Sequence, residues 1–192
     1  MKIGYSVEGS TDRALLWGLR DRWCPDAQMI QGHFRGSTGV SMRREIRKIW
    51  DEFLQKGVDV AVFFMDANDR NWREVKNETR ERVPGERLEF TIIGVADRNV
   101  ECWIWLDPSY VASALRLAPQ VLHIGNPKER FVSAMSIERD DRKEPEIAAL
   151  VRDAPLRRWL AEPSFEDFYD QIRAMSLRRA CEVENLRQSM TG

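Results

Sequence analysis

The sequence predicts an α/β fold in which a mostly parallel sheet is flanked by helices and carries a helical C-terminal extension. Over roughly the first hundred residues, short apolar stretches typical of strands alternate with amphipathic stretches typical of helices. From Pro108 onward the pattern becomes helical. We therefore expect an α/β domain over residues 1–107 and a helical extension, packed on it, over residues 108–192.

The spacing of apolar residues predicts the first three elements. Alternating apolar positions favour a strand over residues 2–7. Helical spacing favours a helix over residues 11–23, with Ser10 or Thr11 as its N-terminal cap. A short second strand is expected within residues 27–32.

The next elements continue the alternation. An amphipathic helix should run from about Val40 and end near Gly57. Residues 58–65, VDVAVFFM, are so uniformly apolar that we expect a strand buried on both faces. A polar helix over residues 72–82 and a buried strand over residues 87–96 follow. This order is typical of a parallel sheet with helices on both sides.

The C-terminal part is expected to be helical in several segments, joined by a polar, loop-rich stretch. That stretch covers residues 123–145. The segments with helical spacing are residues 108–118, 144–153, 154–161 and 164–188.

Composition places the chain among cytoplasmic proteins with no membrane association. It has 43% hydrophobic and 32% charged residues and contains no apolar run of about 18 residues, as a membrane span requires. The N-terminus, MKIGYSVEG, does not have the pattern of a signal peptide. Cys24, Cys102 and Cys181 are odd in number and far apart, which fits a reducing compartment and predicts neither a disulfide framework nor a zinc ribbon.

Charge is unevenly distributed, although the net charge is only −1. Residues 1–50 hold nine Lys or Arg against five Asp or Glu, whereas residues 51–100 hold eight against eleven. A basic first part beside an acidic middle is compatible with phosphate contacts that flank a metal site. Ordinary solvated faces explain the same distribution equally well.

Carboxylates follow the strands of the expected sheet. Glu8 comes after the first strand, and Asp66, with Asn68 and Asp69, comes after VDVAVFFM. Glu101 follows the last strand. Ligands of open parallel sheets bind beyond the carboxyl ends of the strands, so these residues should meet. Their mutual repulsion would be relieved by a divalent cation, and oxygen ligands favour Mg²⁺ or Mn²⁺.

Each carboxylate also has a purely structural interpretation. Glu8 would suit the N-terminus of the helix that follows it. Asp66 and Asp69 are common turn residues, and Asp97 in ADRN fits a turn better than a metal site. Glu101 precedes the apolar stretch CWIWL, where burial would require a partner for its charge.

The loop FRGSTG, residues 34–39, is a candidate phosphate site. Its glycines leave backbone N–H groups accessible just before a helix N-terminus, although the loop is not a Walker A motif. Loop flexibility is the alternative explanation of these glycines. The candidate phosphate or nucleic-acid contacts are Arg13, Arg35, Ser37 and Thr38, with Arg43 and Arg44 as further candidates.

Three motifs support a resemblance to a known family. VEGSTDRALL, ECWIWLDP and PSFEDFYDQI are similar to motifs of small prokaryotic TOPRIM-like proteins of uncharacterised function, and the similarity covers most of the chain. Members have a V-E-G-x-T-[DE] start and an E-x-W motif, and often lie beside ATPase genes in defence-type operons. A more distant resemblance is to the overcoming-lysogenization-defect nucleases. The resemblance implies a TOPRIM-like, Rossmann-like fold.

The resemblance also implies roles for individual residues. Glu8 matches the TOPRIM glutamate, a general acid or base, and Asp66 matches the first aspartate of the D-x-D metal motif. The third position of that motif is Asn68, and the next carboxylate, Asp69, comes one residue late. Either Asp69 replaces it or the site binds its metal more weakly than its relatives do.

The implied function is a Mg²⁺- or Mn²⁺-dependent nuclease that cleaves phosphodiesters, in a phage-defence system with a partner ATPase. Its catalytic residues would be Glu8 and Asp66, and its metal ligands Glu8, Asp66, Asn68, Asp69 and Glu101. One alternative is a catalytically silent TOPRIM-like adaptor that binds an ATPase or nucleic acid. Another is a phosphotransfer domain that uses Asp66 and Lys128. The sequence leaves the oligomeric state open.

Overall fold

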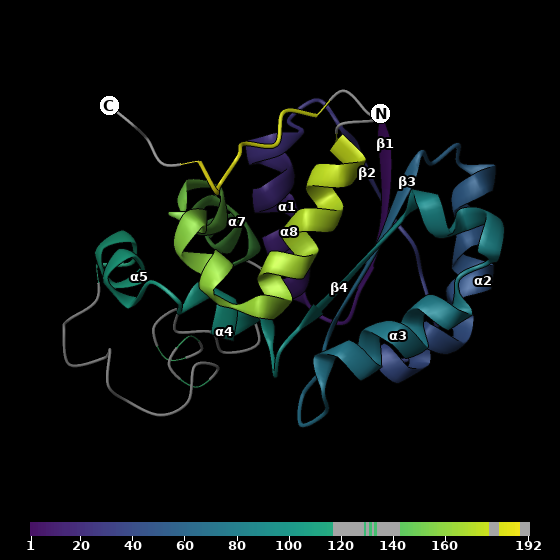
Figure 1. The fold of residues 1–192 in the computed structure, drawn as a ribbon, viewed down its shortest axis with the longest axis horizontal. Coiled ribbons are helices and arrows are strands. Elements are labelled where there is room, and N and C mark those ends of the chain that lie inside the picture. Colours follow the sequence, from purple (N-terminus) through teal and green to yellow (C-terminus); the bar gives the residue numbers. More distant parts are fainter. Residues whose placement is uncertain (117–128, 130, 132, 134–142, 177–180, 189–192) are drawn as a thin grey trace.

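The computed structural model of the chain describes residues 1–116, 129, 131, 133, 143–176 and 181–188. Its centre is a sheet of four parallel strands in the order β2-β1-β3-β4 (Figure 1). The strands are β1 (Lys2–Val7), β2 (Gln28–Gln31), β3 (Val60–Asp66) and β4 (Thr91–Ala96). The predicted α/β class with a parallel sheet flanked by helices is therefore confirmed.

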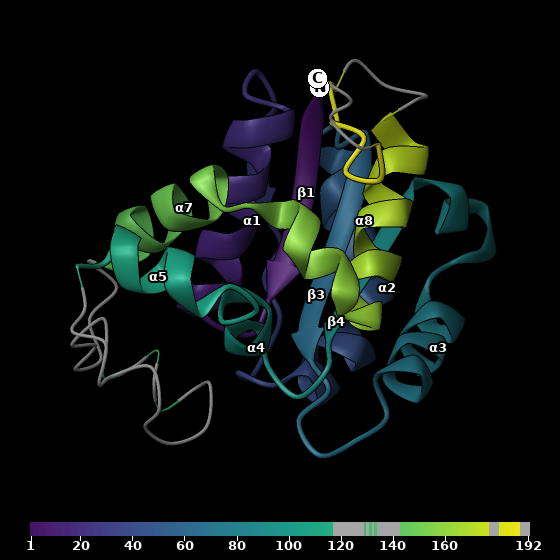
Figure 2. The ribbon, with the colours of Figure 1, turned by 60° about the vertical axis from the view of Figure 1, so that its left-hand side comes forward.

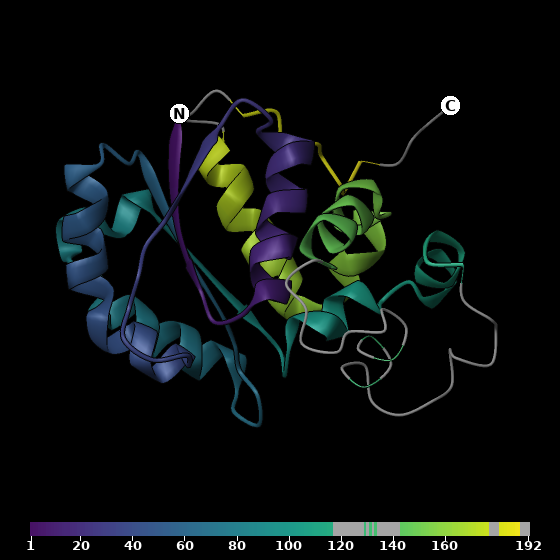
Figure 3. The same ribbon diagram turned by 180° about the vertical axis from the view of Figure 1, so that it is seen from behind.

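Helices cover both faces of the sheet (Figures 1 and 3). The strand β3 supplies both cores, because its side chains alternate between the faces. Val60, Val62 and Phe64 pack with one set of helices, and Ala61, Phe63 and Met65 pack with the other. The first set consists of α1 (Ser10–Trp23), α7 (Glu144–Asp153) and α8 (Pro163–Ser176); the second consists of α2 (Gly39–Gln55) and α3 (Trp72–Arg82).

The C-terminal helices form part of the core of the sheet. Phe165 and Phe168 of α8 pack in T-shaped or tilted contacts with Trp103, and Phe168 also contacts Phe64 of β3. The helix α8 crosses in front of β4 in Figure 2. Its Gln171 accepts a hydrogen bond from the backbone N–H of Ile93 (3.0 Å) and donates one to the backbone oxygen of the same residue (2.9 Å). This side chain satisfies the backbone of an edge strand, which would otherwise be open to another chain.

Several element boundaries differ from those predicted. The predicted strand over residues 87–96 begins only at Thr91, because Gly85–Phe90 form the 3₁₀ helix η1. The helix expected over residues 164–188 ends at Ser176, and residues 181–185 have no regular secondary structure. The cap of α1 is Gly9. The remaining short helices are α4 (Val100–Ile104), α5 (Pro108–Ala114) and the 3₁₀ helix η4 (Leu156–Ala161).

A disulfide joins Cys24, at the end of α1, to Cys181 in the C-terminal segment. The expectation that these cysteines offer no disulfide is wrong. They lie 157 residues apart in the sequence, and α8 brings its C-terminal end back beside the end of α1. The segment is also held by hydrogen bonds, because the Glu182 N–H donates to the Trp23 carbonyl (3.0 Å) and the Tyr169 hydroxyl to the Glu184 carbonyl (2.8 Å).

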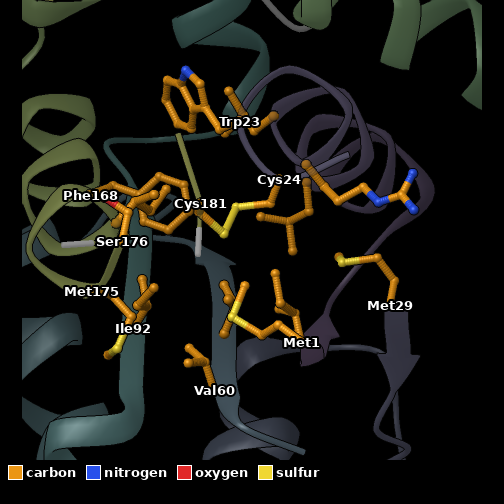
Figure 4. Close-up of a pocket in the computed structure, with 16 residues that line it drawn as sticks. Met1, Trp23, Cys24, Met29, Val60, Ile92, Phe168, Met175, Ser176 and Cys181 are labelled. Carbon is orange, nitrogen blue, oxygen red and sulfur yellow. A yellow bond between two sulfur atoms is a disulfide. The ribbon is translucent and has the colours of Figure 1, made fainter. Parts of the chain in front are cut away.

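The disulfide forms part of the wall of a small apolar cavity of about 70 Å³ (Figure 4). Trp23, Met29, Phe168 and Met175 are among its lining residues. Because Val60 and Ile92 also line it, the cavity lies at the amino ends of the strands.

No helix in the described parts of the chain is both long enough and apolar enough to cross a membrane.

We predict that Cys181→Ser lowers the free energy of unfolding by about 2–4 kcal/mol, because a cross-link restricts the unfolded chain. Urea denaturation followed by tryptophan fluorescence under non-reducing conditions would measure the change. The half-buried free cysteine provides the control, Cys102→Ser. Reductant should destabilise the wild type but not Cys181→Ser, and equal sensitivity of the two proteins would contradict the prediction.

Candidate active site at the carboxyl edge of the sheet

The candidate site lies where the order of strands in the sheet changes direction. From β1 the chain goes first to β2 on one side and then to β3 and β4 on the other. Crevices in open α/β sheets form at such a point, beyond the carboxyl ends of the two central strands. Glu8 follows β1 directly, and Asp66 is the last residue of β3.

A hydrogen bond joins the two strand ends. The backbone N–H of Asp66 donates to Oε1 of Glu8 at 3.2 Å. Glu8 also approaches Gly39, the first residue of α2, so closely that a Cβ atom placed on Gly39 would lie 2.5 Å from the same Oε1. The Glu8 carboxylate therefore sits beside the N-terminus of α2, where the helix dipole favours a negative charge. The alternative in which Glu8 only serves the helix α1 is not what the structure shows.

Asp66 extends the site towards α4. Its Oδ1 accepts a hydrogen bond from the backbone N–H of Val100 at 3.0 Å. Val100 begins α4, so this bond positions the next residue, Glu101, at the same edge of the sheet. Glu101 is buried, with 6% of its surface exposed.

Asp12 is the residue of this site that the sequence analysis missed. It lies in the first turn of α1 and is only 4% exposed. Its Oδ2 accepts a hydrogen bond from the backbone N–H of Gly9 at 2.9 Å. Burial raises the pKa of the Asp12 carboxyl well above its ordinary value, and the charges of Asp66, Glu101 and Glu8 raise it further, against the lowering effect of the Gly9 hydrogen bond.

We call Glu8, Asp12, Asp66 and Glu101 the carboxylate cluster. The charges of the other three all act to raise the pKa of Asp12, so the four carboxyl groups lie close enough to interact. The acidic last position of the V-E-G-x-T-[DE] pattern was a signal that pointed to Asp12. Gly39 had no comparable signal, because its role depends on a contact between distant parts of the chain.

The other predicted metal ligands lie on the loop after β3. Asn68 and Asp69 are both exposed, and Asn68 has a left-handed backbone conformation with φ of 54°. The amide of Asn68 is 3.5 Å from the backbone oxygen of Asp66, at the limit of a hydrogen bond. The structure thus places Glu8, Asp66 and Glu101 together and leaves Asn68 and Asp69 at the rim. Within the residues described, no three His, Cys, Asp or Glu side chains form a group that could hold a metal ion.

Of the predicted phosphate contacts, one is already in an ion pair and the others are exposed on a loop. Arg13 is part of a bidentate ion pair with Glu144 of α7, with 2.7 Å between Nε and Oε2. Arg35, Ser37 and Thr38 are exposed on the loop before α2, and Thr38 caps that helix by accepting a hydrogen bond from the Ser41 N–H at 3.3 Å. Lys128, proposed for a phosphotransfer reaction, lies outside the described residues.

Comparisons with known proteins assign no family to this chain. No protein-family model, no curated protein and no solved structure matches it. The resemblance to TOPRIM-like proteins therefore rests on the motifs alone and stays a prediction.

We predict that Asp12→Asn makes the free energy of unfolding less dependent on pH. A carboxyl with a raised pKa in the folded state binds its proton more tightly there than in the unfolded chain, so stability falls as the pH rises from its ordinary pKa to its folded pKa. Asparagine keeps an oxygen for the Gly9 N–H and carries no charge. Asp12→Asn should therefore gain stability over the wild type as the pH rises through this window.

Urea denaturation at several pH values between 4 and 8 would measure this difference, with the exposed Asp69→Asn as the matched control. A constant difference between Asp12→Asn and the wild type at all these pH values would show that burial does not alter the titration of Asp12.

Proposed function

We propose that the carboxylate cluster is the active site of a TOPRIM-type nuclease that cleaves phosphodiesters with Mg²⁺ or Mn²⁺. The observation that carries the proposal is the convergence of Glu8, Asp66 and Glu101 with the buried Asp12. Two come from the ends of β1 and β3 and two from the first turns of α1 and α4, at the carboxyl edge of a parallel sheet. This is where such sheets bind ligands.

The chemistry of these residues suits a hard divalent cation. All four offer the carboxylate oxygens that such a cation prefers, and the charges of Asp66, Glu101 and Glu8 add to the effect of burial in raising the pKa of Asp12. Glycine at position 39 lets the Glu8 carboxylate approach the start of α2, because a Cβ there would lie 2.5 Å from Oε1 of Glu8. Asp66 and Glu101 would be the principal ligands, joined by Glu8 after rotation of its side chain, and Asn68 or Asp69 would complete the set from the rim. A bound cation would stabilise charge on the attacking and leaving oxygens of the phosphodiester.

The chain's own residues have separate tasks in this proposal. Glu8 would take or return the proton of the reacting oxygen, as a general base or acid. Asp66 holds the end of β3 and the start of α4 in place through Val100, so it positions both Glu8 and Glu101. Asp12 fixes the turn between β1 and α1 through Gly9, and its raised pKa lets it keep its proton to a higher pH than an ordinary aspartate would.

A second candidate function is that of a catalytically silent adaptor that binds an ATPase partner or nucleic acid. It is favoured by the exposed positions of Asn68 and Asp69 and by the lack of a ready-made metal group among the described residues. In either function we propose a cytoplasmic location and a partner ATPase in a defence system. Because a reducing cytoplasm would favour the thiols of Cys24 and Cys181, assays should be run with and without reductant.

We predict that Mg²⁺ or Mn²⁺ raises the melting temperature, because a ligand that binds only the folded state stabilises it, by about 2.7 kcal/mol at a hundred times its dissociation constant. Asp66→Asn should lose most of this shift. Asp69→Asn should keep it if the cluster alone binds the cation. Differential scanning fluorimetry and calorimetric titration would measure the effect, and no binding at millimolar concentrations would favour the adaptor.

We predict that Glu8→Gln lowers any cleavage rate by about 10²–10⁴-fold, because it removes proton transfer while preserving shape. Most of the thermal shift with Mg²⁺ should remain. The assay would use labelled single- and double-stranded DNA and RNA, with and without a partner ATPase, and Glu89→Gln as an exposed control. If wild type and Glu8→Gln behave alike on every substrate, the nuclease proposal fails and the adaptor function remains.

A further inference from the structure

An arginine-lined groove runs between α2 and α3, which lie side by side (Figures 1 and 3). It consists of two adjoining hollows of about 240 and 250 Å³ that share most of their lining residues. We call this surface the arginine groove, and its lining residues are Val40, Arg43, Arg44, Arg47, Glu78, Glu81 and Arg82.

The cations of the groove outnumber its anions. Among the described residues, the side chains of Arg44, Arg47 and Arg82 donate no hydrogen bond and join no ion pair. Arg43 is the most buried of the four, with 11% of its side chain exposed, and lies 3.8 Å from Glu78, which also pairs with Arg70. Burial lowers the pKa of the Arg43 guanidinium, and the charges of Arg70 and Arg82 add to this effect. The groove therefore gathers positive charge that an external anion would compensate.

One end of the groove lies close to the carboxylate cluster. Gly39, Arg43 and Arg47 are four residues apart, so they lie on one side of α2 and advance about 12 Å along it. Gly39 is in contact range of Glu8, and Nη1 of Arg43 lies 3.6 Å from the sulfur of Met65, the residue before Asp66. A row of cations thus begins at the cluster and leads away from it.

We propose that the arginine groove holds the sugar–phosphate backbone of a single nucleic-acid strand whose next phosphate reaches the carboxylate cluster. Planar guanidinium groups bind phosphate oxygens in pairs, and their succession along α2 suits a chain of repeating phosphates. The two hollows, of about 240 and 250 Å³, are small and adjoining, which suits a single strand better than a duplex. The proposal rests on the proposed nuclease function and names the path of its substrate.

The test is binding of the full-length protein to fluorescently labelled single-stranded oligonucleotides, measured by anisotropy at several salt concentrations with EDTA to prevent cleavage. The double variant Arg44→Gln/Arg47→Gln should bind at least tenfold more weakly than the wild type at low salt. The slope of log K against log salt concentration should fall by about 1.4, since each phosphate contact on a single strand contributes about 0.7. Circular dichroism would show that the variant is folded.

The matched control is Arg80→Gln/Arg157→Gln, which removes the same charge from exposed positions outside the groove. It should keep the wild-type slope. Equal losses in the two double variants, or tight binding of duplex with none of single strands, would overturn the groove as the strand's path while leaving the nuclease proposal standing. If the wild type binds no nucleic acid at low salt, both proposals fail. If the groove variant loses binding and the wild type cleaves no substrate, the groove is supported as a nucleic-acid site and the protein as an adaptor.

Discussion

The hydrogen bond from the Asp66 N–H to the Glu8 carboxylate ties together the ends of the two central strands, and the candidate site depends on it. It is possible because β1 and β3 pair in parallel with Val7 opposite Phe64, so that Glu8 follows level with Met65, one residue before Asp66. Parallel pairing requires helical crossovers, and these supply the remaining parts of the site. Asp12 comes from the crossover helix α1, and Gly39 from α2.

Local patterns were sufficient to predict the sheet and much of its helical cover. The apolar run in β3 and the alternating apolar residues in β1 both predict strands, whether one face or both faces are buried. The spacing of apolar residues in α2 predicts an amphipathic helix. The exceptions depend on contacts between distant segments. Residues 85–90 form a 3₁₀ helix before β4, and the backbone N–H groups of Glu182 and Leu186 bond to Trp23 and Tyr169 instead of to a continuing helix. Helical spacing could not reveal these contacts.

The site was predictable to the extent that it follows from topology. Glu8, Asp66 and Glu101 could be placed at one edge because the carboxyl ends of parallel strands always share an edge. Their partners were not predictable in the same way. The backbone N–H of Asp66 donates to Glu8, and that of Val100 donates to Asp66. The positions of these two donors depend on the strand register and on the turn into α4. The disulfide between Cys24 and Cys181 depends on where α8 ends, which no local pattern specifies.

Asp12 gives the most direct argument that the cluster is more than a set of helix caps. Its structural task is to accept a hydrogen bond from Gly9, and asparagine or serine could perform that task without a charge. A carboxylate at this buried position is disfavoured by desolvation and by three like charges nearby. A fold under no other constraint has no reason to bear this electrostatic cost at the edge of the sheet where parallel sheets bind their ligands. The cost is understandable if the charges are balanced by a bound cation or used to hold a proton, which are the two tasks that the proposed reaction requires.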